Sequence, residues 1–132
     1  MLNDRRRELF LASLLKHIFS FYPFMNRERL KLLKEYLKED PDDPFNWYAV
    51  AIEYLDQHPT DALPYFEELL EKHENYVGTY YHAANLFNLL GNKERAEKTY
   101  QKGLRISLAQ GDRHAHRELQ NAYNEFLFEE EE

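Results

Sequence analysis

The stretch LLGNKERAEKTY, residues 89–100, places a glycine and an asparagine between two apolar runs that are compatible with helices. Gly91 can adopt the left-handed backbone conformation that ends a helix, and the side chain of Asn92 can cap the helix that follows. Glu94 then falls in the first turn of that helix, where a negative charge is favoured. The stretch therefore predicts two helices joined by a tight turn, with a small residue, Ala96, near the start of the second.

The same arrangement occurs upstream at a nearly constant spacing, which indicates a repeat. In the second helix of each copy the matching residues are 34 positions apart, in the pairs Ala62 and Ala96, Phe66 and Tyr100, Leu69 and Gly103, and Leu70 and Leu104. In the first helix they are 33 positions apart, in the pairs Trp47 and Tyr80, Val50 and Ala83, Ala51 and Ala84, and Tyr54 and Phe87. The first copy is thus one residue shorter at its turn.

Large and small residues share one face of the first helix in each copy. They stand at relative positions 0, 3, 4 and 7, which lie on the same side of an α-helix. A ring, two small residues and a second ring form a knob, a groove and a knob, into which another helix can pack closely. Ala62 and Ala96 are small because the facing helix passes near them. We therefore expect an all-α fold of antiparallel helix pairs.

These residues resemble the tetratricopeptide repeat family over about residues 43–110. The resemblance implies an α-solenoid with two full repeats flanked by half-repeat or capping helices, and it suggests a small stand-alone bacterial protein. Two features depart from the family pattern. The turn DQHPTD at residues 56–61 lacks the glycine, and Glu74 and Leu108 stand where a proline usually ends each unit. Because Pro64 lies in the opening of its helix, we expect that helix to begin no earlier than Thr60 or Asp61.

The chain is expected to divide into an extension, a helical domain and a tail. The expected segments are an N-terminal extension at 1–24, a tetratricopeptide-like domain at 25–128 and a frayed acidic tail at 129–132. The domain holds full repeats at about 43–76 and 77–110 and a capping helix at about 112–128.

The ends of the helical domain show capping signals. Asn26 is expected to cap a helix that ends near Glu39, and Asp112 is expected to cap the last helix. Six helices are therefore expected from Asn26 onward. The role of the extension stays open among three alternatives: a helix docked on the fold, an amphipathic helix on a membrane surface, or a segment outside the functional protein if translation begins at Met25.

Composition narrows the classes of function. Lys and Arg total 17 against 24 Asp and Glu, and the resulting net charge of −7 repels a phosphate backbone, which argues against nucleic acid as a ligand. Cysteine is absent, so disulfides, thiolate metal sites and cysteine nucleophiles are excluded, in keeping with a cytoplasmic location. Within residues 1–24 the longest uncharged stretch is far shorter than the roughly 20 residues that span a bilayer, so a membrane-spanning segment is not expected there.

Sequence motifs for catalysis or metal binding are missing. The chain has no glycine-rich phosphate loop, nucleophile elbow or zinc-binding helix motif. His114 and His116 fall on roughly opposite sides of a helix, and the other histidines have no partner at ligand spacing. We therefore expect a protein that is not an enzyme and that uses neither a metal nor a cofactor.

In the tetratricopeptide repeat family the ligand usually lies in a concave groove lined by the first helix of each repeat, so the resemblance implies an adaptor that binds a protein or peptide. The candidate groove residues are Tyr48, Ile52, Leu55, Gly78, Tyr81, Asn85, Asn88 and Leu89. Members that clamp a carboxylate use lysines and asparagines here, and only Asn85 matches, so we expect an apolar or tyrosine-compatible peptide helix.

Two alternatives to an open groove remain. The terminal helices can cover Tyr48 and Leu55, in which case these side chains are simply part of the core. Incomplete solenoids can also pair through the apolar groove face to form a homodimer, which makes the protein structural rather than an adaptor.

Overall fold

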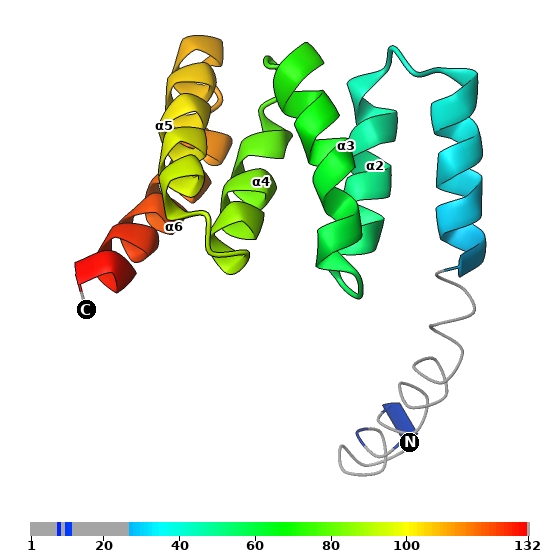
Figure 1. The fold of residues 1–132 in the computed structure, drawn as a ribbon, viewed down its shortest axis with the longest axis horizontal. Helices are drawn as coiled ribbons and strands as arrows, with labels where there is room; N and C mark the ends of the chain where they lie inside the picture. The colour runs from blue at the N-terminus through cyan, green and yellow to red at the C-terminus, as the bar shows by residue number, and fades with distance from the viewer. Residues whose placement is uncertain (1–7, 9, 12–26, 132) are drawn as a thin grey trace.

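The computed structural model describes residues 8, 10–11 and 27–131, and this part of the chain forms only helices and the turns between them (Figure 1). A helix over residues 27–39 comes first among those after residue 26. It is followed by α2 (Pro44–Leu55), α3 (Pro59–Lys72), α4 (Gly78–Leu89), α5 (Lys93–Gln110) and α6 (Arg113–Glu131). The predicted all-α fold and the six helices from Asn26 onward are confirmed. The cap at Asn26, the start at Met25 and most of the N-terminal extension lie outside the described residues.

The helices stand side by side in chain order, from the 27–39 helix at one end to α6 at the other (Figure 1). Helix α2 packs against α3 and α4 packs against α5, which gives the two predicted helix pairs. Helix α3 contacts α4 between the pairs, and α6 contacts both α4 and α5 at the C-terminal end. The structure is thus the predicted α-solenoid of two pairs flanked by single helices.

Two of the turns end a helix with a glycine at positive φ, as was expected for Gly91. Gly91 has a φ of 82°, and the Asn92 N–H that follows donates to the Phe87 carbonyl at 2.8 Å, which closes the end of α4. The Asn92 side chain then accepts a hydrogen bond from the Arg95 N–H at 3.2 Å and caps α5. Gly111, with a φ of 70°, ends α5 in the same way. The Asp112 side chain accepts from the Ala115 N–H at 3.0 Å and caps α6, as predicted.

The glycine-free turn between α2 and α3 differs from the prediction. Helix α3 begins at Pro59, one residue before the earliest start expected from Pro64. Proline is well suited to the first helical position because its missing N–H would have no partner there and its φ is already helical. Pro64 lies inside α3, and the helix continues through it to Lys72.

The small residues of the repeat lie at the centre of the core. Ala51, Ala62, Ala83, Ala84 and Ala96 are all fully buried. They lie among the large buried side chains, which are Phe66, Leu69, Tyr80, Leu86, Phe87, Tyr100, Leu119 and Phe126. The close packing inferred from the repeat pattern is therefore confirmed, and most of the favourable free energy of folding comes from this apolar burial.

Helix α6 runs to Glu131, beyond residue 128 where the sequence predicts its end. The Glu130 carboxylate pairs with the Lys93 ammonium at 3.1 Å, and the Asn88 side-chain amide donates to Glu129 at 3.4 Å. These contacts hold the end of α6 beside the turn between α4 and α5. Among the described residues, no helix has the length and apolar character needed to cross a membrane.

Candidate functional site

Aromatic side chains from α2, α4 and the segment before α4 meet on one face, which we call the inner face and define by Tyr48, Tyr76, Tyr81 and His82. The Tyr48 ring centroid lies 5.4 Å from that of Tyr76 and 5.9 Å from that of His82. The rings of Tyr81 and His82 lie 5.1 Å apart and almost perpendicular, at 89°. Such tilted and edge-to-face pairs are favourable ring geometries. The inner face therefore connects the first repeat with the second through a continuous series of ring contacts.

All four side chains are half-buried, so their rings are packed and still accessible on one side. Burial raises the pKa values of Tyr48 and Tyr76, and their hydroxyl groups stay protonated at neutral pH. Burial lowers the pKa of His82, while the Glu118 carboxylate on α6 acts in the opposite direction. The inner face thus offers neutral rings and hydroxyl donors, with one acidic group from α6 near them.

The structure places the predicted groove residues in different environments. Tyr48, Ile52, Leu55 and Tyr81 are half-buried and pack against the core cluster. Leu89 is 71% exposed at the end of α4. Gly78 lies beside the rings, since a Cβ built on it would be 3.5 Å from Tyr76 and 3.6 Å from Tyr48. Of the predicted groove residues, Tyr48 and Tyr81 therefore belong to the inner face, and Gly78 lies beside it.

The two asparagines of α4 have defined hydrogen-bond partners. The Tyr100 hydroxyl on α5 donates to the side-chain oxygen of Asn85, which orients the Asn85 amide. The side-chain oxygen of Asn88 accepts from the Lys93 ammonium at 2.5 Å, and its nitrogen donates to Glu129. Asn88 therefore connects the ends of three helices, and it is not grouped with the rings of the inner face.

Sequence reasoning missed Tyr76, His82 and Glu118. Tyr76 lies between α3 and α4, at the end of the first repeat and outside the helix positions that the repeat pattern matches. His82 follows Tyr81 on α4, but its sequence spacing was considered only as a metal-ligand pattern, in which it has no partner. Glu118 acts on Tyr48 and His82 only because α6 packs against α4. The adjacency of His82 to Tyr81 was the one signal that pointed to this group.

The described side chains do not assemble a metal site. No group of three or more His, Asp or Glu residues is placed to hold a metal ion within the part of the chain that the structure describes. His114 pairs with Glu118 at 3.6 Å, whereas His116 lies 3.1 Å from the Ser107 hydroxyl, so the two imidazoles have different neighbours. The inner face is chemically suited to stacking and hydrogen bonding with a ligand.

Comparison with solved structures decides the family. The crystal structure of a tetratricopeptide repeat domain protein from Salinibacter ruber is 38% identical to this chain, with a TM-score of 0.61, and the match covers 64% of this chain and 96% of that one. The solution NMR structure of a tetratricopeptide repeat domain protein from Salinibacter ruber is 40% identical, with a TM-score of 0.61, over 66% of this chain and 89% of that one. The chain belongs to the tetratricopeptide repeat family. No family model and no curated protein matches it.

The family resemblance inferred from the repeat pattern is therefore confirmed. A tetratricopeptide repeat solenoid is a module for protein–protein interaction, and this coarse function follows from the two matches. The structures matched are themselves small bacterial tetratricopeptide repeat domains.

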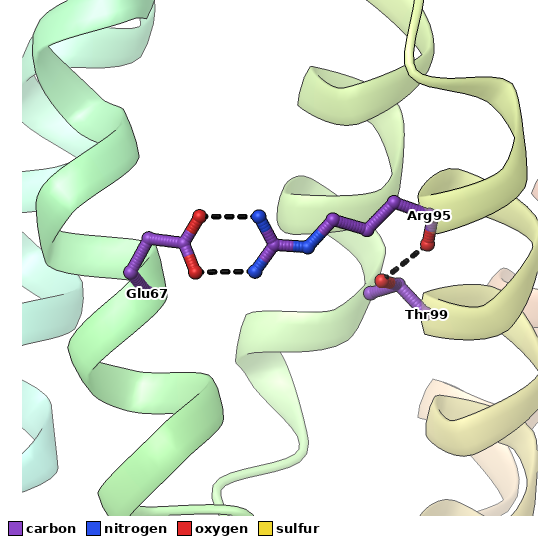
Figure 2. Close-up of polar contacts among 3 residues, drawn as sticks. All are labelled: Glu67, Arg95 and Thr99. Atoms are coloured by element: carbon purple, nitrogen blue, oxygen red, sulfur yellow. Dashed lines mark hydrogen bonds and ion pairs between the residues drawn. The ribbon is translucent and has the colours of Figure 1, made fainter.

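Figure 2 shows an ion pair that joins the two tetratricopeptide repeats. The Arg95 guanidinium on α5 donates two hydrogen bonds to the Glu67 carboxylate on α3. The guanidinium also lies 4.2 Å from the centroid of the Phe87 ring on α4, which is a cation–π distance. The hydrogen bonds to Glu67 raise the pKa of Arg95. The Thr99 hydroxyl donates to the Arg95 carbonyl at 2.7 Å within α5. Arg95 thus links α5 to α3 of the first repeat and to α4 of the second.

Proposed function

We propose that this protein is an adaptor that binds a peptide or protein segment on its inner face, where side chains of α2, α4 and the segment before α4 meet. The observation that carries the proposal is the series of half-buried rings that runs from Tyr76 through Tyr48 and His82 to Tyr81. Aromatic residues of this kind supply much of the binding free energy in protein interfaces. Their side chains are already held by packing, so little conformational entropy is lost on binding.

The surroundings of these rings favour an apolar or aromatic peptide segment. The candidate groove residues include no lysine, which speaks against a clamp for a C-terminal carboxylate. The Asn85 amide is oriented by Tyr100, and burial raises the pKa values of Tyr48 and Tyr76, so their protonated hydroxyls can donate to peptide carbonyls. A short amphipathic helix that places apolar side chains against Tyr48 and Tyr81 satisfies this arrangement. We include in this proposal the cytoplasmic location that is expected from the composition.

Capture of a partner from the native host, followed by measurement of its affinity, tests the proposal. We expect Tyr81→Ala and Asn85→Ala to lose the partner while circular dichroism shows unchanged helicity. Tyr36→Ala is the matched control, because Tyr36 is 48% exposed on the 27–39 helix, away from the inner face. Tyr100→Phe removes the hydrogen bond to Asn85 without changing a ring of the inner face. Retention of the partner by both Tyr81→Ala and Asn85→Ala would refute the proposal.

Self-association is the second candidate, and exposed apolar side chains favour it. Leu89 at the end of α4 is 71% exposed and Phe128 near the end of α6 is 64% exposed. The hydrogen bond between Asn88 and Glu129 shows that these two ends lie close together. Exposed apolar groups placed together are typical of interaction surfaces. Light scattering at several concentrations tests this candidate: a stable dimer that Tyr81→Glu dissociates supports pairing through the groove face, and a monomer at all concentrations rules it out.

A further inference from the structure

A recess lies away from the inner face, among the 27–39 helix, α2 and α3. Its volume is about 650 Å³, and its lining includes the rings of Trp47, Tyr54 and Tyr65 together with Asp61. This volume falls within the range of about 300–1,000 Å³ that is usual for small-ligand sites. None of its lining residues belongs to the inner face. The recess is therefore a separate surface that the adaptor function does not use.

The three rings of the recess are held in a fixed arrangement. The Tyr54 and Tyr65 centroids lie 5.6 Å apart with their planes at 30°, and those of Trp47 and Tyr65 lie 6.0 Å apart at 49°. The Trp47 indole N–H donates to the Pro41 carbonyl at 2.7 Å, which fixes that ring relative to the turn before α2. All three rings are half-buried, so each keeps part of its surface accessible. The recess thus has three aromatic rings in its lining.

A cation from the chain itself already lies at this cluster. The Lys34 ammonium is 5.1 Å from the centroid of the Tyr54 ring, within the range of cation–π attraction. Interaction with the Tyr54 hydroxyl raises the pKa of Lys34, and Asp61 acts in the same direction. Asp61 is exposed near the start of α3, where it can meet a charge that enters from solvent. The electrostatics of the cluster therefore favour a positive charge.

We propose that Trp47, Tyr54, Tyr65 and Asp61 form a binding site for an alkylated ammonium cation. Methyl groups spread the positive charge and lower its desolvation cost, so an alkylated ammonium gains more from ring faces than a bare ammonium does. The Asp61 carboxylate supplies the compensating negative charge. Both a free quaternary ammonium compound and a methylated lysine side chain of a protein contain such a cation. Separate binding measurements with each distinguish these two sources.

The full-length protein carries its own probe, because Trp47 is the single tryptophan of the sequence. Choline is titrated while Trp47 fluorescence is followed, with calorimetry as an independent measurement. The uncharged isostere 3,3-dimethylbutan-1-ol is the ligand control, since it has the same shape without the charge. We expect choline to bind saturably and about tenfold more tightly than the alcohol, the size expected for a cation–π contribution. Equal responses to choline and the alcohol, or no saturation by choline, would overturn the proposal.

Variants assign the binding to the recess. Asp61→Asn and Tyr65→Leu are expected to weaken choline binding several-fold, and Lys34→Gln is expected to strengthen it because a competing positive charge is removed. Tyr81→Ala on the inner face is the matched control and should bind choline like the wild type. Unchanged choline affinity in both Asp61→Asn and Tyr65→Leu, with their helicity intact, would also overturn the proposal. A trimethyl-lysine peptide that binds at least tenfold more tightly than choline identifies a protein source, and comparable affinities identify a free cation.

Discussion

Gly103 on α5 lies directly against Tyr80 on α4: a Cβ built on Gly103 would come within 2.5 Å of the Tyr80 Cβ and 3.1 Å of the Leu119 side chain. The Tyr80 Cβ is attached to the backbone, so it cannot rotate away. Leu69 occupies the corresponding position in the first repeat. The two repeats therefore differ at this point, where the second repeat has no side chain and α5 comes close to the α4 backbone.

We predict that Gly103→Ala destabilises the protein although alanine is the better helix former. The gain in helix propensity is about 1 kcal/mol, but overpacking of a core contact typically costs about 1–3 kcal/mol and forces the helices apart. Urea denaturation monitored by circular dichroism measures the net change. Gly91→Ala is the control, because its Cβ meets nothing within 4 Å and only the positive φ of 82° is strained, at about 1–2 kcal/mol. An increase in stability for Gly103→Ala would contradict the packing described here.

The buried alanines give a second prediction. Ala84 and Ala96 are fully buried where the helices approach, so Ala84→Leu and Ala96→Leu should each lower the free energy of unfolding by about 1–3 kcal/mol. Ala109→Leu is the matched control on α5, since Ala109 is exposed. Thermal unfolding compares the three variants. Unchanged melting of the two core variants would argue against closely packed helix pairs.

The Glu67–Arg95 pair should contribute modestly to stability and should weaken with salt. Its side chains are 38% and 42% exposed, so we expect a coupling free energy of only about 0.5–1 kcal/mol in a double-mutant cycle with Glu67→Gln and Arg95→Gln. High salt should reduce the coupling because the pair is partly screened by solvent. The exposed pair Glu94–Lys98 within α5 is the control and should show a smaller coupling. A salt-independent coupling would contradict an electrostatic origin.

His82 should make stability sensitive to acid. Burial lowers its pKa in the folded protein, so the unfolded chain binds a proton first as the pH falls below about 6.5. The stabilising contribution of neutral His82 is therefore present above that pH and decreases below it. We expect urea denaturation at pH 7.5 and pH 5.5 to show a smaller loss of stability for His82→Gln than for the wild type.

Glu118 provides the matched test, because its carboxylate raises the pKa of His82 and so opposes the effect of burial. Glu118→Gln should increase the loss of stability at acid pH. Identical pH dependence in the wild type and His82→Gln would show that His82 is not buried in the folded protein.

The helices, their pairing and the caps at Asn92 and Asp112 were predictable from the sequence. Each depends on residues close together in the chain: Gly91 and Asn92 form one turn, and a ring with two alanines forms one helix face. The predicted start of α3 was one residue too late. Pro64 was expected to disturb the first turn, and the suitability of Pro59 for the first helical position was not taken into account. The extension of α6 to Glu131 was missed because its glutamates were interpreted as a solvated tail.

The candidate sites were predictable only in part. Tyr48 and Tyr81 were predicted because they lie on the faces of the first helices that the repeat pattern leaves free of packing, whereas Glu118 and the Glu67–Arg95 pair depend on how one repeat is rotated against the next. The recess of Trp47, Tyr54 and Tyr65 likewise requires the 27–39 helix, α2 and α3 to meet.

The sequence by itself determined that the chain forms helix pairs in two repeats, since spacing and capping are local properties of the backbone. Only the tertiary structure decided which side chains from different repeats face one another. The angle between successive helix pairs is the sum of many side-chain contacts, and no short stretch of residues encodes that sum.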